Sequence, residues 1–293
     1  MAKDSQFKMP QIFVLGDSQF AFGAGPTFHD FLENFAQNCG RYSTESNLVE
    51  KIDRLRVGVM GVRSTSLHSW VAHKWKRKKF VCEPDPKWDV NARLFGWQGR
   101  TDGTYVQLGR DRGFRICHSG QSAFEAVFDD MRRPELFFLF FTGNAVHRWA
   151  NAPKRTAKDV KKLMAQIPPG VPCVFMTTVP SHRKKENDLR WKTQIGIRKA
   201  FEKYGPSCSF VEGHTLATVK EFQTQAKYFR RRPSGKVEDP YHPNKRGARK
   251  FVDMRRGAIC TAVLHQFQRA RNTATMAIPS HMALRNSFMA PDD

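Results

Sequence analysis

The sequence has no apolar stretch long enough to span a membrane, since its longest apolar block is LFFLFF at 136–141. Its six cysteines include no C-x-x-C pair, which disfavours a zinc knuckle. Nothing in their spacing indicates disulfide bonds, and Cys117 and Cys173 lie in apolar runs where reduced core thiols are expected. The N-terminal apolar run is too short for a secretory signal. We therefore expect a soluble, cytoplasmic protein, or one that is exported by another route.

Several common nucleotide-binding and hydrolase motifs are missing as well. The sequence contains no G-x-S-x-G elbow and no Walker A motif. The G-x-G of FGAGPTF has no third glycine and runs directly into Pro26, so we expect Gly23 and Gly25 to lie in a loop before a helix. Acidic residues are also few, 27 against 49 Lys and Arg, which gives a formal net charge of +22. A field of that sign attracts nucleic acid, acidic polysaccharide or anionic lipid.

Short apolar runs and segments with helical spacing alternate along the chain. The runs are 11–15, 56–60, 114–117, 136–141, 173–178 and 208–211. Because they are almost continuously apolar, they predict strands buried on both faces, as in a parallel sheet. The helical segments are 26–40, 122–133, 157–167, 188–205 and 244–270. This alternation predicts a doubly wound, flavodoxin-like α/β fold of three α/β/α layers, with a central parallel sheet of about five strands.

The domain organisation follows from the same pattern. We expect a single domain over residues 1–270 and a flexible C-terminal tail over 271–293, which lacks strong periodicity. Residues 63–112 are rich in Trp, Gly, Pro and charge and interrupt the alternation. They predict an insertion with a small hairpin around 101–108. Insertions of this length often cover a site.

Three residues are candidates for nucleophilic catalysis, and one of them lies more than 220 positions before the other two. Ser18 ends the apolar run of IFVLGDS, where an open α/β sheet binds its ligands, although a turn serine or helix cap fits the local sequence too. Asp239 and His242 lie three residues apart in EDPYHPNKRG, a stretch that Pro240 and Pro243 stiffen and that leads into the last helical segment. An aspartate so placed can hold an imidazole in one tautomer with its other nitrogen facing outward.

An acyl-transfer site also needs hydrogen-bond donors for the oxyanion. Asn144 follows the run 136–141 in TGN, and Gly120 follows the run 114–117 in HSGQS. Both fit simple turns equally well. A glycine at such a strand end lets its backbone N–H approach a ligand closely.

Together these stretches resemble the SGNH (GDSL-like) serine hydrolase family. That family has a GDS block after the first strand, a glycine block, a G-x-N block and a D-x-x-H block near the end. The corresponding stretches here are GDSQ, HSGQS, TGN and DPYHPN, within about residues 11–265. The resemblance is to a member with a long insertion after the second strand.

The sequence departs from the family pattern at identifiable positions. Gln19 replaces the usual leucine, Thr142 replaces the first glycine of the G-x-N block, and Ala145 stands where aspartate is common. Gly61 in GVMGVRSTSLHSW is an alternative for the glycine block. Gly120 is preferred because 144 − 120 = 24 residues before Asn144 leave room for one helix and one strand.

The resemblance implies a serine esterase with the triad Ser18, His242 and Asp239. Its oxyanion hole would consist of the Ser18 and Gly120 backbone N–H groups and the Asn144 side chain. No metal and no organic cofactor is implied. We expect the substrate to be a carbohydrate or small ester that carries acetyl or other short acyl groups, and an anionic one would fit the basic charge.

A second hypothesis is a non-catalytic polyanion-binding protein on the same fold. Basic clusters occur at 73–79, 229–236 and 245–250. Aromatic residues between or near them could stack on bases or sugars, namely Trp75, Trp88, Trp97 and Tyr105. A solvated surface is the simpler explanation for any one cluster.

Overall fold

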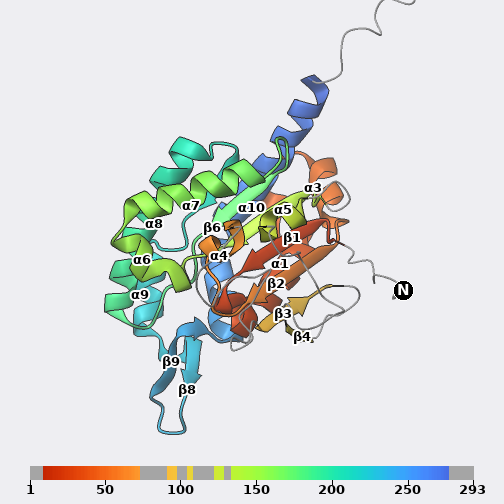
Figure 1. The fold of residues 1–293 in the computed structure, drawn as a ribbon. Coiled ribbons are helices and arrows are strands. Elements are labelled where there is room, and N and C mark those ends of the chain that lie inside the picture. Colours follow the sequence, from red (N-terminus) through yellow and green to blue (C-terminus); the bar gives the residue numbers. More distant parts are fainter. Residues whose placement is uncertain (1–8, 73–90, 98–103, 108–121, 129–132, 277–293) are drawn as a thin grey trace, which may run out of the picture.

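The computed structural model describes residues 9–72, 91–97, 104–107, 122–128 and 133–276 (Figure 1). These residues contain a seven-stranded sheet in the order β4-β3-β2-β1-β5-β6-β7. The strands that run parallel to one another are β1 (Ile12–Gly16), β2 (Val57–Val62), β5 (Leu136–Phe140), β6 (Cys173–Met176) and β7 (Cys208–Val211). The predicted doubly wound α/β class is therefore confirmed, including its parallel core of five strands.

The apolar runs form strands because their side chains alternate between two buried layers. In β1, Ile12 and Val14 pack into one hydrophobic cluster, while Phe13 and Leu15 pack into the other. All residues of β1, β2 and β5 are buried. The predicted strand at 114–117 lies outside the described residues.

The strand order places a topological switch point between β1 and β5. From β1 the chain crosses to β2 on one side of the sheet and later returns to β5 on the other. Open α/β sheets bind ligands beyond the carboxyl ends of the strands at such a point. The segments that follow β1 and β5 therefore border the expected site.

Two antiparallel strands extend the sheet beyond β2. They are β3 (Asn91–Phe95) and β4 (Thr104–Gln107), so the region predicted as an insertion with a hairpin contributes the sheet edge. The start of that region belongs to the main fold, because α4 (Leu67–Val71) carries the fully buried Trp70. The remainder at 73–90, 98–103 and 108–112 lies outside the described residues.

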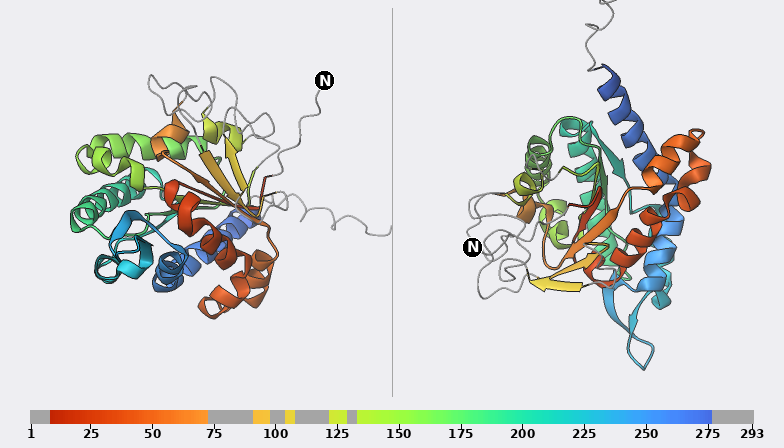
Figure 2. Two further views of the ribbon diagram at one scale, coloured as in Figure 1. Left: turned by 90° about the horizontal axis from the view of Figure 1, so that it is seen from below. Right: turned by 90° about the vertical axis from the view of Figure 1, so that its right-hand side faces the viewer.

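Helices cover both faces of the sheet (Figures 1 and 2). One face packs against α4, α5 (Ala123–Val127), α6 (Val146–Ala150), α7 (Pro153–Gln166) and α8 (Lys184–Tyr204). The other packs against α1 (Gly25–Glu33), α2 (Phe35–Cys39), α3 (Ser46–Asp53), α9 (Leu216–Thr224) and α10 (Lys245–Met276). Each helix turns an apolar stripe toward the sheet, as Val160 and Leu163 of α7 do.

The helices differ from the sequence predictions in detail. The segment predicted at 26–40 divides into α1 and α2 at Asn34, and α10 continues past residue 270 to Met276. The helices α3 and α9 were not predicted. No helix of the described residues is both long and apolar enough to cross a membrane.

Two disulfides join distant parts of the described chain. Cys39 of α2 is bonded to Cys260 of α10, and Cys173 of β6 is bonded to Cys208 of β7. The prediction of a reduced thiol at Cys173 was wrong because the parallel register places Cys173 opposite Cys208, with a Cα–Cα distance of 4.5 Å. Their separation of 35 residues gives no sign of this pairing.

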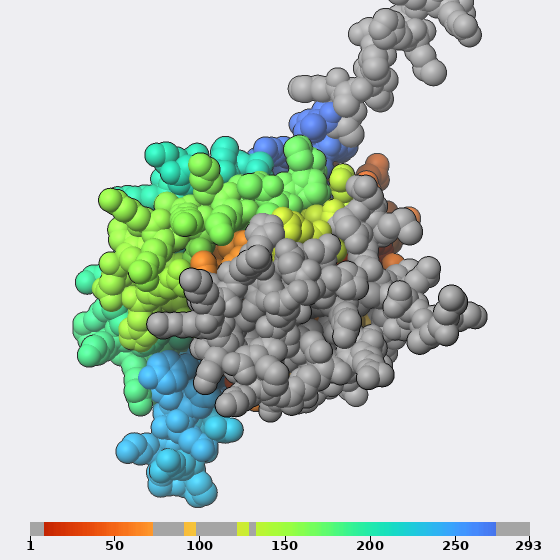
Figure 3. All heavy atoms as spheres, in the orientation of Figure 1, coloured from red at the N-terminus to blue at the C-terminus, as the bar shows by residue number. Residues whose placement is uncertain are grey.

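A two-stranded hairpin projects from the body of the molecule just before α10 (Figures 1 and 3). It consists of β8 (Phe229–Arg231) and β9 (Val237–Pro243). Four short helices complete the described structure: η1 (Phe20–Ala24), η2 (Gly40–Tyr42), η3 (Gly143–Ala145) and η4 (Ala226–Tyr228). The hairpin is important because β9 carries two of the candidate catalytic residues.

Candidate active site

Ser18, His242 and Asp239 form a continuous chain of hydrogen bonds. The Oγ of Ser18 lies 2.8 Å from Nε2 of His242, and Nδ1 of His242 lies 2.8 Å from Oδ2 of Asp239. A carboxylate only accepts hydrogen bonds, so Nδ1 carries the proton and Nε2 is left to accept from the serine hydroxyl. This is the arrangement of a nucleophile, its base and the group that orients the base.

Asp239 is held in place by its own strand. Its Oδ1 accepts hydrogen bonds from the backbone N–H groups of Tyr241 and His242, at 3.0 and 3.2 Å. Partial burial by itself raises the pKa of the Asp239 carboxyl, but the hydrogen bond and charge of His242 outweigh it and leave the pKa below its usual value. Asp239 is therefore ionised and fixed in orientation at neutral pH.

Ser18 begins a helical turn directly after β1. The backbone N–H groups of Phe20 and Ala21 both bond to the carbonyl of Asp17, which closes this turn. Backbone N–H groups in a first helical turn have no acceptor earlier in the helix. The Ser18 N–H is therefore available for a ligand at the switch point.

Asn144 reaches the same place from the end of β5. It lies on η3, and its side-chain Nδ2 donates to the Thr65 carbonyl at 2.9 Å, which leaves a second N–H. The loop is tied to β1 because the buried Asp17 carboxylate accepts from the N–H of Gly143 at 3.0 Å and of Gln19 at 2.9 Å. Asp17 thus sets the spacing between the two loops that border the site.

Of the two glycines proposed for the oxyanion hole, the described residues include Gly61, which does not line the serine-side cavity. Gly120 lies outside the described residues. Gly61 lies inside β2, where a Cβ would meet the backbone N of Ala21 at 2.2 Å, so it makes room for η1. Three residues further on, Ser64 borders the site with a positive φ of 62°, a conformation that favours glycine.

Gln19, where leucine was expected, connects three parts of the site. The side chain is 1% exposed. Its Oε1 accepts from the Val179 N–H at 2.8 Å, and its Nε2 donates to the carbonyls of Val179 at 3.1 Å and Tyr241 at 2.9 Å. Gln19 therefore fixes the nucleophile turn against the segment after β6 and against the strand that carries His242.

Gly23 allows the histidine-bearing strand to approach this turn. A Cβ at Gly23 would lie 2.0 Å from the carbonyl oxygen of Pro243, the residue after His242. The predicted loop at Gly23 and Gly25 was wrong, because Gly23 lies in η1 and Gly25 begins α1. These glycines serve close packing within helices.

Phe22 covers the outer side of the triad. It is 40% exposed, and its ring centroid lies 4.5 Å from that of His242. The Arg63 guanidinium lies 4.9 Å from the centre of the same ring. No local sequence pattern predicts this contact, since Phe22 and Arg63 follow different strands.

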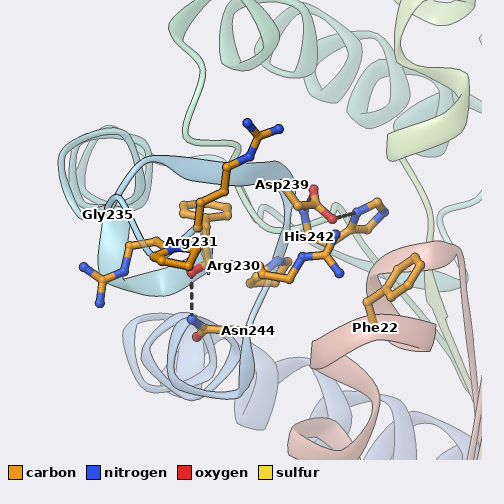
Figure 4. A pocket seen from close by; sticks show the side chains of 11 residues that line it. Phe22, Arg230, Arg231, Gly235, Asp239, His242 and Asn244 are labelled. Atoms are coloured by element: carbon orange, nitrogen blue, oxygen red, sulfur yellow. Dashed lines mark hydrogen bonds and ion pairs between the residues drawn. The ribbon is translucent and has the colours of Figure 1, made fainter.

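Two cavities meet at His242. The serine cavity has a volume of about 610 Å³ and is lined by Ser18, Gln19, Phe22, Arg63, Ser64, Gly143, Asn144, Val146, His147, Glu186, Arg190, Arg230, Asp239, Tyr241 and His242. The hairpin cavity, of about 800 Å³, is lined by Phe22, Phe229, Arg230, Arg231, Arg232, Pro233, Gly235, Asp239, His242, Pro243 and Asn244. Figure 4 shows the second, with the β8–β9 arginines on one side and His242 and Phe22 on the other.

Buried charged residues lie in the wall of the serine cavity and next to it. Arg190 is 2% exposed and bonds to the Glu186 carboxylate and the Val179 carbonyl. Burial lowers the pKa of Arg190, which the charges of Glu186 and Asp17 partly offset. Burial likewise raises the pKa of Asp17, against the opposing effect of its backbone hydrogen bonds and of His242 and Arg190.

The structure describes two of the three basic clusters of the polyanion hypothesis. The cluster 229–236 lies on the β8–β9 hairpin, and 245–250 lies at the start of α10. Trp97 is buried and stacks edge-on against Phe13, so it cannot serve as a stacking platform. The cluster 73–79, Trp75 and Trp88 lie outside the described residues. Within the described chain no group of three or more His, Cys, Asp and Glu is placed to hold a metal ion.

No protein-family model and no curated protein sequence matches the chain. Among solved structures, the chain is similar to the crystal structure of a DUF4886 family protein from Bacteroides uniformis, with 11% sequence identity and a TM-score of 0.44. The match covers 91% of this chain and 94% of that chain. Likeness at this level supports no statement about function.

Proposed function

We propose that the chain is a serine esterase that removes acetyl or other short acyl groups from a carbohydrate or small ester. The observation that carries this proposal is the hydrogen-bond chain from Ser18 through His242 to Asp239. It lies beyond the carboxyl ends of β1 and β5, the neighbouring strands at the topological switch point. The family resemblance of the four sequence blocks supports the same function.

In the first half of the reaction, Ser18 Oγ attacks the acyl carbonyl while His242 Nε2 takes its proton. The carbonyl oxygen becomes an oxyanion, which accepts hydrogen bonds from the Ser18 backbone N–H and the Asn144 side chain. The bond to the alcohol oxygen then breaks. His242 returns its proton to that oxygen, and the acyl group remains on Ser18.

In the second half, a water molecule takes the place of the alcohol. His242 removes a proton from this water, whose oxygen attacks the acyl carbonyl on Ser18. The tetrahedral intermediate uses the same two donors. Collapse returns the proton from His242 to Ser18 Oγ and releases a carboxylic acid, which restores the starting enzyme. Asp239 stabilises the imidazolium in both halves.

The decisive experiment is labelling with a serine-reactive fluorophosphonate. We expect mass spectrometry to locate the label on Ser18, and His242→Ala to abolish labelling because the hydroxyl loses its base. Ser46, an exposed serine at the start of α3, provides the control: Ser46→Ala leaves labelling unchanged. A wild-type protein that takes no label at Ser18 contradicts the proposal.

The alternative is non-catalytic binding of nucleic acid or acidic polysaccharide. It is favoured by one observation, the run of exposed arginines 230–232 on the projecting hairpin. A binder of this kind would bind heparin or DNA in a salt-dependent manner and would remain unlabelled at Ser18. Labelling and salt dependence together distinguish the two functions.

The cellular location also belongs to the proposal. Cytoplasmic residence was expected from the sequence, whereas the two described disulfides favour an oxidising compartment. We place the esterase in such a compartment. Mass analysis with and without reduction, on protein isolated under alkylating conditions, tests this location directly.

A further inference from the structure

The hairpin cavity continues the serine cavity past His242. Four described residues line both, His242 and Phe22 among them, whereas Ser18 and Asn144 line the serine cavity and not the hairpin cavity. The oxyanion donors therefore lie in the first cavity, and the imidazole separates it from the second. A substrate larger than its acyl group has room on both sides of the base.

The described lining of the hairpin cavity is rich in positive charge. Arg230, Arg231 and Arg232 line it, and Asp239, the carboxylate in its described lining, is already bonded to the catalytic histidine. Arg230 also contacts the exposed Glu238 at 3.1 Å. Within the described residues, Arg231 and Arg232 have no carboxylate partner. Guanidinium groups bind carboxylate and phosphate in a bidentate geometry.

The proposed reaction decides which part of the substrate enters this cavity. The carbonyl oxygen must face Ser18 and Asn144, and the alcohol leaves from the side of His242, which protonates it. We infer that the hairpin cavity binds the alcohol part of the ester and that this part is anionic. The substrate is therefore an O-acylated acidic glycan, an inference that rests on the proposed esterase function.

A glycan fits better than the other polyanions. It supplies hydroxyl groups that can be acylated together with carboxylates for the arginines, whereas a nucleic acid backbone supplies phosphates and no acyl ester. The hairpin that lines the cavity projects from the body of the molecule (Figure 3), so a chain of sugar units can extend along β8 and β9. The exposed face of Phe22 borders both cavities.

The test compares an anionic with a neutral polymer. Acetylated homogalacturonan carries carboxylates, whereas acetylated xylan has a neutral backbone. Both polymers are assayed with the wild type and with the double variant Arg231→Gln and Arg232→Gln. We expect kcat/KM on acetylated homogalacturonan to fall about tenfold more than on acetylated xylan, mainly through KM, because charged hydrogen bonds are lost. Added salt should raise KM for the anionic polymer in the wild type and less so in the variant.

The matched control removes the same charge elsewhere. Lys158 and Lys161 are exposed on α7, and Lys158→Gln with Lys161→Gln should leave the ratio between the two polymers unchanged. Thermal melting verifies that both double variants are folded. Equal losses on both polymers, or no loss on either, overturn the inference.

A binding measurement separates this inference from the esterase proposal. Ser18→Ala protein is titrated with de-acetylated homogalacturonan by calorimetry, with and without the two arginine substitutions. Weaker binding after the substitutions supports the anionic subsite, whether or not hydrolysis is observed, while equal binding overturns it. Single-stranded DNA of equal charge serves as competitor, and tighter binding of DNA through the same arginines overturns the glycan assignment.

Discussion

The Nε2 atom of His242 lies 2.8 Å from the Oγ atom of Ser18, although 224 positions separate the two residues. Ser18 is placed by β1 at the centre of the sheet, and His242 by β9 outside it. Neither strand pairs with the other, so other contacts must fix the distance between them. Gln19 and Gly23 both contact β9 from the turn that carries Ser18, and these contacts help to set the distance.

Asp239→Asn should abolish most of the activity while preserving the shape of the site. An asparagine can turn its N–H toward Nδ1 of His242, which leaves Nε2 protonated and unable to accept from Ser18. We expect kcat for p-nitrophenyl acetate to fall by roughly 10⁴-fold. Asp188→Asn, at an exposed position of α8, provides the control and should leave kcat unchanged. A fall of less than tenfold in Asp239→Asn contradicts the triad.

Asn144→Ala should lower kcat with little change in KM. The side-chain N–H acts on the oxyanion, which exists in the transition state and not in the bound ester. Removal of one such donor typically costs about 10²–10³-fold in kcat. Asn151, an exposed residue that follows α6, is the matched control, and Asn151→Ala should behave as the wild type. A large rise in KM at constant kcat would instead indicate a role in substrate binding.

The sequence predicts those features of the fold and site that leave a pattern within one short segment, and it misses those that depend on contacts between distant segments. Continuous apolarity predicted β1, β2, β5, β6 and β7, because burial on both faces leaves its mark on each strand separately. The order of the four blocks singled out Ser18, Asp239 and His242 as the candidate triad, and these three side chains are hydrogen-bonded in the structure. The antiparallel edge strands, the pairing of Cys173 with Cys208 and the contacts of Gln19 depend on tertiary neighbours. Their partners lie tens to hundreds of residues away, so no local pattern marks them.

Gln19→Leu restores the leucine of the family pattern and tests whether the buried contacts of Gln19 hold His242 near Ser18. Leucine cannot satisfy the buried Val179 N–H or the Tyr241 carbonyl, and each lost partner costs about 1–3 kcal/mol. We expect a lower melting temperature and a fall in kcat of about tenfold or more as His242 moves away from Ser18. Gln37→Leu, at an exposed position of α2, is the control for the loss of an amide. Normal kcat in a destabilised Gln19→Leu would limit Gln19 to a structural role.

Gly23→Ala should displace the strand that carries His242. The added Cβ would lie 2.0 Å from the Pro243 carbonyl oxygen, so either η1 or β9 must move. We expect a destabilisation of about 1–3 kcal/mol and, since a shift of about 1 Å misaligns the base, a fall in kcat of about 100-fold. Gly196 of α8 has no atom within 4 Å of its Cβ position. Gly196→Ala should therefore leave kcat unchanged and stabilise the helix by about 0.5–1 kcal/mol. Equal behaviour of the two variants contradicts the role assigned to Gly23.

His214 should make the folded state less stable at acidic pH. It is fully buried, and burial lowers the pKa of its imidazole well below the usual value, with a further contribution from the charge of Arg190. In the unfolded chain the imidazole takes up a proton below about pH 6.5, whereas the folded state excludes that proton. The free energy of unfolding therefore decreases as the pH falls below about 6.5, by up to about 1.4 kcal/mol per pH unit from this residue.

Urea unfolding between pH 5 and 8 gives the free energy of unfolding of the wild type and of His214→Phe at each pH. The difference between the two curves measures the contribution of His214. The phenylalanine has a similar shape and binds no proton, so the wild-type curve should fall more steeply below pH 6.5 while the two run parallel above it. Other histidines contribute equally to both curves and cancel. If His214→Phe does not fold, NMR titration of the wild-type ring gives the same information, since a buried neutral imidazole shows no chemical-shift change above pH 5.5. A ring that titrates near pH 6.5 in the folded protein contradicts the prediction.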